Sequence, residues 1–135
     1  MTKKSGLGAT LAVDDGSGTT RATSNDFLSV SVSTPRGVQD ITGIDKSAIE
    51  RLLLLADAKF DYSGVFNDTA TTGSHVVLST ASSTSVNRLH TYTVQTKVLA
   101  CEMIIPDYPL SRGADGALTF SISAMLSDGS VPTWA

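Results

Sequence analysis

Residues 35–68 read PRGVQDITGIDKSAIERLLLLADAKFDYSGVFND, and this stretch decides how the chain folds. Its last part alternates, with Ala58, Phe60 and Tyr62 on one side and charged or polar residues between them, which is typical of a half-buried β-strand. Its first part, residues 35–56, joins this strand to the preceding one. That connection is much longer than the ~2–5 residues of an ordinary hairpin loop.

The long connection is also apolar. It carries Val38, Ile41, Ile44 and Ile49, which fit poorly with a disordered segment. Long ordered loops in compact domains usually serve as lids or binding loops. We therefore predict that these four side chains need a partner surface that this small chain does not supply.

Two interpretations are open where the connection meets the strand. Residues 47–50, Ser-Ala-Ile-Glu, match a capping box and favour a short helical turn that runs through Leu54. Alternatively, residues 51–66 form one long strand in which Leu52 and Leu54 continue the face of Phe60. The sequence does not decide between them, and we favour the helical turn.

The rest of the chain predicts mainly strands. Leu118, Phe120 and Ile122 alternate with small polar residues, which is the strongest strand pattern present. We expect further strands over residues 10–13, 27–34, 89–96 and 98–105, a turn over 14–18, a bend near 95–97, a helix over 74–81 capped by Ser74, and a hairpin loop over 111–116. In residues 27–34 we place Leu28, Val30 and Val32 on one face. The predicted fold is a single domain over residues 1–135: an antiparallel β-sandwich or barrel of about six to eight strands with one α-helix and a flexible arm over residues 1–9.

Composition limits the classes of partner. The net charge is −3 and the lysines and arginines are scattered, which argues against a nucleic-acid binder. Only 17% of the residues are charged, whereas Ser and Thr together make up 35 of the 135. A surface with many hydroxyls and few charges suggests contact with other protein molecules.

Cys101 is the single cysteine and lies in an apolar run, so we expect a buried, inert thiol. We see no signal peptide and no apolar stretch near the ~18 residues of a membrane span, and we expect synthesis in a cytoplasm.

The sequence gives no sign of catalytic chemistry. His75 and His90 have no cysteine or carboxylate at metal-ligand spacing, so we interpret both as surface or core-edge residues and expect no metal. We also expect no cofactor, because no glycine-rich phosphate loop is present, and no enzymatic activity. Asp57 and Asp61 share one strand face with Lys59 between them, which favours a solvated face over a carboxylate pair.

Several segments in order, STPRGVQDITGIDKSAIERLLLLADAKFDYSGVFND, GSHVVLST and IIPDYPLSRGADGALTFSISAMLSDGSVPTWA, resemble the major tail (tail tube) proteins of long-tailed, non-contractile bacteriophages of the siphovirus type, especially those of actinobacterial phages. The resemblance covers nearly the whole chain from residue 11 onward. It implies a β-sandwich subunit, no active site, and hexameric rings whose inner sheets merge into a barrel around a lumen.

The same resemblance implies a location in the virion tail, with the rings stacked around a tape-measure protein and with a tail terminator and distal tail or baseplate proteins as further partners. DNA would then pass through the lumen into the bacterial host without specific binding. In that setting residues 35–56 are an assembly loop, and Val38, Ile41, Ile44 and Ile49 contact a neighbouring subunit or ring. Because a conduit must release DNA, we expect a neutral or acidic lumen and place Asp57 and Asp61 among its lining residues. The alternative is a β-sandwich decoration or binding protein on a virion surface.

Overall fold

The computed structural model describes residues 3–135. Its strands are β1 (Thr10–Asp14), β2 (Thr20–Ala22), β3 (Phe27–Ser33), β4 (Arg36–Asp40), β5 (Arg51–Ala56), β6 (Lys59–Val65), β7 (Arg88–Val94), β8 (Lys97–Ile104), β9 (Leu110–Arg112) and β10 (Leu118–Leu126). A 3-10 turn, η1 (Ser24–Asp26), precedes β3, and a short helix, α1 (Ser74–Leu78), follows β6. The prediction of a mainly β, antiparallel fold with one helix is confirmed.

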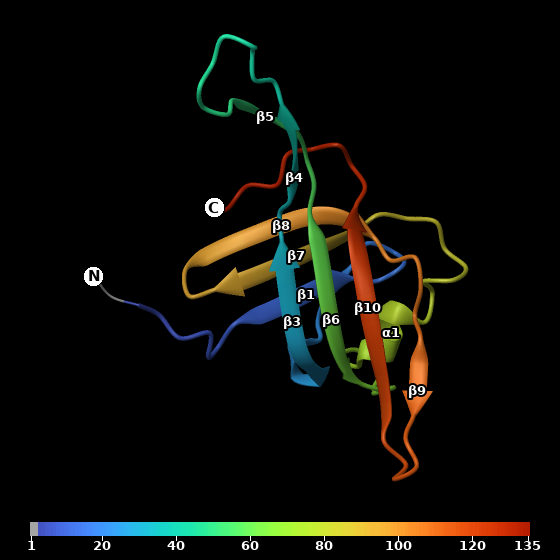
Figure 1. Ribbon diagram of the computed structural model, residues 1–135. Coiled ribbons are helices and arrows are strands. Elements are labelled where there is room, and N and C mark those ends of the chain that lie inside the picture. Colours follow the sequence, from blue (N-terminus) through green and yellow to red (C-terminus); the bar gives the residue numbers. More distant parts are fainter. Residues whose placement is uncertain (1–2) are drawn as a thin grey trace.

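One antiparallel sheet makes both layers of the body (Figure 1). Its strand order is β2-β1-β7-β8-β10-β6-β3, and β9 pairs with β10 beside this path. β10 meets β8 only at Met125 and Leu126, so the sheet turns over at this point. The strands β3, β6 and β10 form the front layer in Figure 1, and β1, β7 and β8 cross behind them.

Side-chain alternation builds the core between the two layers. β6 and β10 turn Phe60, Tyr62 and Ile122 inward, and β8 turns Leu99 and Met103 toward them, all with at most 2% of their surface exposed. Each such burial contributes about 1.5–3 kcal/mol to stability. The alternation read from residues 118–126 therefore predicted the inner face of β10 correctly.

The predicted bend near residues 95–97 is a tight hairpin. Val94 pairs with Lys97, so Gln95 and Thr96 alone make the turn. Gln95 has a φ of 57°, a left-handed conformation that two-residue hairpin turns require. The two strands expected on either side are confirmed.

The helix is present but shorter than predicted, and Ser74 does not cap it. Gly73 is the residue before the first turn, and Ser74 is fully buried. Its amide donates to Asp26 Oδ2 at 2.8 Å and its hydroxyl donates to the Val65 carbonyl at 3.1 Å. Ser74 thus ties the helix to η1 and β6, which sequence spacing alone does not reveal.

β3 is irregular at its start. The pairing with β6 shifts between Phe27 and Ser29, and Leu28 is left 70% exposed, so the placement of Leu28 on one face with Val30 and Val32 was wrong. A bulge of this kind adds one residue and changes the direction of the side chains after it. Opposite the bulge, Gly64 packs against the Asp26 carbonyl so closely that a Cβ would collide with it.

Residues 36–56 form a β-ribbon that projects beyond the body. β4 and β5 pair only with each other, in a separate two-stranded sheet. The helical turn predicted after Ser47 is therefore wrong, since residues 51–56 are strand. The single long strand over 51–66 is also wrong, because Asp57 and Ala58 separate β5 from β6.

The predicted N-terminal arm includes residues 1–2, which lie outside the described residues. Residues 3–8 are exposed. The Gln95 side-chain amide donates to the Ser5 carbonyl at 3.3 Å, so this segment runs past the β7–β8 turn.

Candidate assembly surfaces

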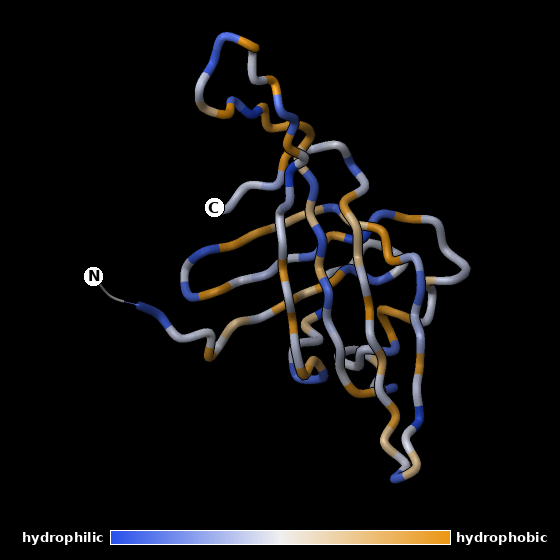
Figure 2. The backbone as a smooth tube through the Cα atoms, viewed as in Figure 1, coloured by the Kyte–Doolittle hydropathy of each residue, from blue (hydrophilic) through white to orange (hydrophobic). Residues whose placement is uncertain are grey.

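The ribbon presents apolar side chains on both of its faces. Leu52, Leu53, Leu54 and Leu55 are all exposed, and Leu55 is 90% exposed. Figure 2 shows hydrophobic segments in the ribbon well away from the body. A two-stranded ribbon is marginally stable alone in water. The burial that would normally stabilise such a strand pair is missing within this copy.

Local hydrogen bonds nevertheless order the ribbon. The Arg36 guanidinium donates twice to the Leu54 carbonyl, at 3.0 and 2.8 Å. At the tip, the Thr42 hydroxyl and amide donate to Asp40 Oδ1, and these bonds lower the pKa of Asp40. The Glu50 amide donates to the Thr42 hydroxyl oxygen at 2.8 Å. The tip is therefore an ordered loop, as we expected from its apolar content.

The four residues predicted as contacts all lie in the ribbon with their side chains exposed. Val38 is in β4, opposite Leu53. Ile41, Ile44 and Ile49 lie at the tip, and Ile44 is the most exposed, with a relative accessibility of 108%. The structure brings them together on one projection of the chain.

The outward face of the front layer is lined by hydroxyl groups. The strand registers place these residues in rows across β3, β6 and β10: Ser29–Ser63–Ser121, Ser31–Asp61–Ser123 and Ser33–Lys59–Met125. β9 extends the face with Ser111 opposite Thr119. The Ser29 and Ser63 hydroxyls are 2.7 Å apart, so these neighbours within one row are hydrogen-bonded across β3 and β6.

Asp57 and Asp61 do not share a strand. Asp61 is on the hydroxyl face, where it accepts a hydrogen bond from the Ser123 hydroxyl at 2.7 Å and lies 3.8 Å from Lys59 Nζ. Asp57 lies before β6, at the base of the ribbon, where its amide donates to the Pro35 carbonyl and its carboxylate accepts from the Ala58 amide. The placement of both on one polar strand face was therefore wrong for Asp57.

The front layer has a free edge on each side. Within residues 3–135, β3 pairs only with β6 and β9 pairs only with β10. The unpaired amides and carbonyls of such edges are a template for another strand. The four strands β9, β10, β6 and β3 thus form a sheet with a hydroxyl face and two open sides.

A histidine and a tyrosine form a polar pair inside the core. The Tyr62 hydroxyl lies 3.0 Å from Nε2 of His90, and the His90 Nδ1 lies 2.9 Å from the Arg88 carbonyl. Burial and, to a smaller extent, the nearby Arg88 charge lower the pKa of His90, the backbone hydrogen bond to Arg88 and the charge of Asp14 oppose the shift, and the resulting pKa is about 4. His90 is therefore a neutral residue of the core centre, where we had expected a core-edge position.

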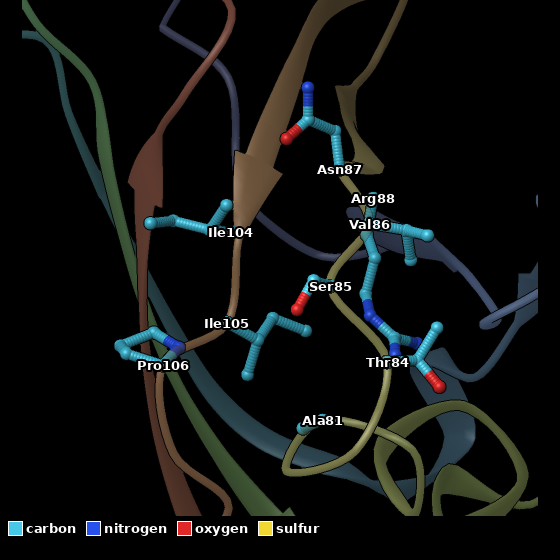
Figure 3. Close-up of a pocket in the computed structure, with 9 residues that line it drawn as sticks. All are labelled: Ala81, Thr84, Ser85, Val86, Asn87, Arg88, Ile104, Ile105 and Pro106. Carbon is cyan, nitrogen blue, oxygen red and sulfur yellow. The ribbon is translucent and has the colours of Figure 1, made fainter.

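The buried Arg88 borders the recess drawn in Figure 3. This recess has a volume of about 330 Å³ and lies between residues 104–106 and residues 84–87. The Arg88 guanidinium is already engaged: it donates to the Val77 carbonyl at 2.7 Å and to the Thr80 hydroxyl at 2.6 Å. Because these hydrogen bonds hold the guanidinium at the C-terminal end of α1, Arg88 is not free to bind an anionic ligand in the recess.

The remaining reactive groups are structural. Cys101 is buried as predicted, and burial raises the pKa of its thiol. In the part of the chain that the structure describes, no cluster of three His, Cys, Asp or Glu residues could hold a metal ion. Among these same residues, no helix has the length and apolar character needed to cross a membrane.

Comparison with known proteins identifies solved structures that have a similar fold. No family model and no curated protein matches the sequence. Among the solved structures that match, two do so over 98% of this chain and 99% of their own: a chain of the tail of an empty gene transfer agent particle refined with helical C6 symmetry (TM-score 0.79, 14% identity), and a chain of the virion of a native gene transfer agent particle (TM-score 0.74, 11% identity). The resemblance to phage tail tube proteins is thus confirmed at the level of the fold.

Sequence reasoning missed two features of the structure, one in the exposed ribbon and one in the core. The four consecutive leucines Leu52–Leu55 show no hydrophobic periodicity, so the sequence does not predict a ribbon that is exposed on both faces. The pair Tyr62–His90 joins β6 to β7, strands that are distant in sequence. The alternation of Arg88, His90 and Tyr92 along β7 was the available signal that His90 faces inward.

Proposed function

We propose that this chain is the structural subunit of a phage-like tail tube, in which copies form rings, the rings stack, and the channel carries DNA. The observation that carries the proposal is the combination of a four-stranded sheet open at both edges with an apolar ribbon whose two strands, within residues 3–135, pair only with each other and leave their leucines exposed. The fold likeness to a chain of a C6-symmetric tail supports it.

Ring formation would join β3 of one copy to β9 of the next. The strands β9, β10, β6 and β3 alternate in direction. Rotation about a tube axis preserves the direction of each strand, so β3 and the neighbouring copy's β9 would run antiparallel. The pairing would remove both exposed edges and close the sheets into a barrel.

Stacking would bury the ribbon. It projects past the end of the front layer, as an element that reaches another ring must do (Figure 1). A contact between two different surfaces of identical subunits generates a filament when successive copies do not close on themselves, as in a stack along the tube axis. Val38, Ile41, Ile44 and Ile49 are the residues that we assign to this contact.

Electron microscopy of the purified protein, across a range of protein and salt concentrations and with its tape-measure protein, tests the proposal. We expect hollow tubes of uniform diameter that lengthen with concentration. Discrete particles under all of these conditions would contradict a tube subunit and would favour a decoration or binding protein on a virion.

A further inference from the structure

We propose that Asp61 serves to cancel the charge of Lys59, so that the hydroxyl face stays electrically neutral toward a phosphate backbone that moves past it. The inference rests on the proposed function, because it takes the hydroxyl face as the wall of the channel. It keeps Asp61 among the lining residues of a neutral or acidic lumen and gives this carboxylate a role that does not involve Asp57.

The charge count of the face carries the inference. The outward residues of β3 are Ser29, Ser31 and Ser33, which are uncharged, and β9 and β10 contribute only Ser111, Thr119, Ser121, Ser123 and Met125. β6 carries the ionic groups of the face, Lys59 and Asp61. Arg112 of β9 pairs with Leu118, so strand alternation places it on the opposite face from Ser111. Among the described residues, the side chains that these four strands turn to the hydroxyl face therefore include one positive and one negative charge, and their sum is zero.

The two charges are close enough to act as a pair. Lys59 Nζ lies 3.8 Å from Asp61 Oδ2, and both side chains are about half exposed. A solvated pair of this kind contributes little to stability. The pair matters more for a third charge, such as a DNA phosphate. The fields of two opposite charges a few ångströms apart largely cancel at distances near the ~8 Å Debye length of physiological salt.

A hydrogen bond from the neighbouring strand fixes the orientation of the Asp61 carboxylate. The Ser123 hydroxyl donates to Oδ1, which leaves Oδ2 toward Lys59. An asparagine at position 61 would keep a carbonyl acceptor for Ser123 and remove only the charge. Asp61→Asn therefore exposes an uncompensated lysine on every subunit while it preserves the local hydrogen bond.

Unpaired lysines repeated along a channel would hold DNA. Each phosphate contact releases condensed counterions, so many weak contacts add to a strong, salt-dependent affinity. Serine and threonine hydroxyls instead exchange hydrogen bonds with water and phosphate at similar energy. A neutral hydroxyl wall consequently lets a polyanion slide, and it needs no repulsion to do so.

The test is a charge cycle on assembled tubes. Tubes of wild type, Lys59→Gln, Asp61→Asn and the double variant are first verified by electron microscopy and then sedimented with a short fluorescent DNA duplex at several salt concentrations. Asp68→Asn, which removes an exposed carboxylate from the loop after β6 and outside the four strands of this face, is the matched control.

We expect Asp61→Asn tubes to retain roughly tenfold more duplex than wild type at low salt, with the excess lost as salt rises. The double variant, Lys59→Gln, wild type and Asp68→Asn should all retain little. Retention that persists in the double variant, or no retention by Asp61→Asn, would overturn the inference while leaving the tube intact. If wild-type protein forms no tubes, the proposed function fails and this inference fails with it.

Discussion

The Tyr62 hydroxyl donates a hydrogen bond to Nε2 of His90 across 3.0 Å at the centre of the core. The direction of this bond follows from the other ring nitrogen. Nδ1 faces the Arg88 carbonyl, which can only accept, so Nδ1 carries the proton and Nε2 accepts from Tyr62. The pair links β6 in the front layer to β7 in the back layer, and it requires that His90 remain neutral.

His90 makes folding sensitive to mild acid. The unfolded chain takes up a proton near the ordinary pKa of 6.5, whereas burial holds the pKa of folded His90 at about 4. The contribution of neutral His90 to stability is therefore fully present above its pKa in the unfolded chain, and it is lost as the pH falls through its pKa in the folded chain. We expect the free energy of unfolding, measured in urea, to decrease by up to about 3 kcal/mol across this window.

His90→Gln is the control for this pH effect, because glutamine does not titrate. The variant should be less stable at neutral pH but should show a smaller loss between pH 6.5 and 4. An equal loss in both proteins would assign the pH dependence to other groups.

Asp15 contributes at lower pH and in a different part of the sheet. Burial raises its pKa, but hydrogen bonds from Thr19 and Ser17 and the ion pair with Arg21 at 3.0 Å outweigh burial and lower the pKa to about 2. Its contribution is present above the ordinary pKa of 3.8 and is lost as the pH falls through about 2.

Asp15→Asn should therefore destabilise the fold by about 1–2 kcal/mol at neutral pH, because the β1–β2 turn loses a charged acceptor. Asp14→Asn is the matched change next to it, where the carboxylate accepts only from the exposed Thr20 hydroxyl. Equal losses in the two variants, measured by thermal unfolding, would contradict the role assigned to Asp15.

Gly64 is required by the close approach of η1 to β6. A Cβ at this position would collide with the Asp26 carbonyl and come within 2.9 Å of the Phe120 ring. Because backbone cannot move aside as a side-chain tip can, Gly64→Ala should cost about 1–3 kcal/mol or more. Gly6→Ala, where no atom lies within 4 Å of the added Cβ, should leave chemical denaturation unchanged. A neutral Gly64→Ala would show that η1 shifts freely.

The ribbon tip should govern assembly without affecting the fold of the subunit. Ile41→Asp with Ile44→Asp places two charges on exposed positions, so the circular dichroism and thermal midpoint of the monomer should match wild type. The same change should block tube growth, because it would bury charge at the stacking contact. Ile41→Val with Ile44→Val should still assemble. Tubes of normal length from the Asp variant would exclude the tip from the inter-ring contact.

Sequence periodicity predicted the core strands of this fold because β6, β8 and β10 each have one buried face. β10 is the clearest case, since Phe120, Ile122 and Ala124 are buried between exposed neighbours. The same logic failed for the ribbon. β5 has no buried face in a single copy, so its four leucines show no period two, and the capping box at Ser47 suggested a helix that tertiary pairing with β4 overrides.

The candidate surfaces were only partly accessible from sequence. The serines of β3 and β10 were visible as polar alternations, but their alignment into rows with Asp61 depends on strand register and on the order β10-β6-β3. The grouping of Asp57 with Asp61 failed because Asp57 lies between the end of the ribbon at Ala56 and the start of β6 at Lys59. A spacing of four residues cannot reveal where a strand begins.

We propose that the front layer forms the inner wall of a tube through its two free edges. A cryo-electron microscopy map of the assembled protein would show the position of this layer. We expect β3 of each subunit to pair antiparallel with β9 of its neighbour and Ser123, Asp61 and Ser31 to face the tube axis. A map with these residues on the outer wall, or with β3 and β9 unpaired between subunits, would contradict it.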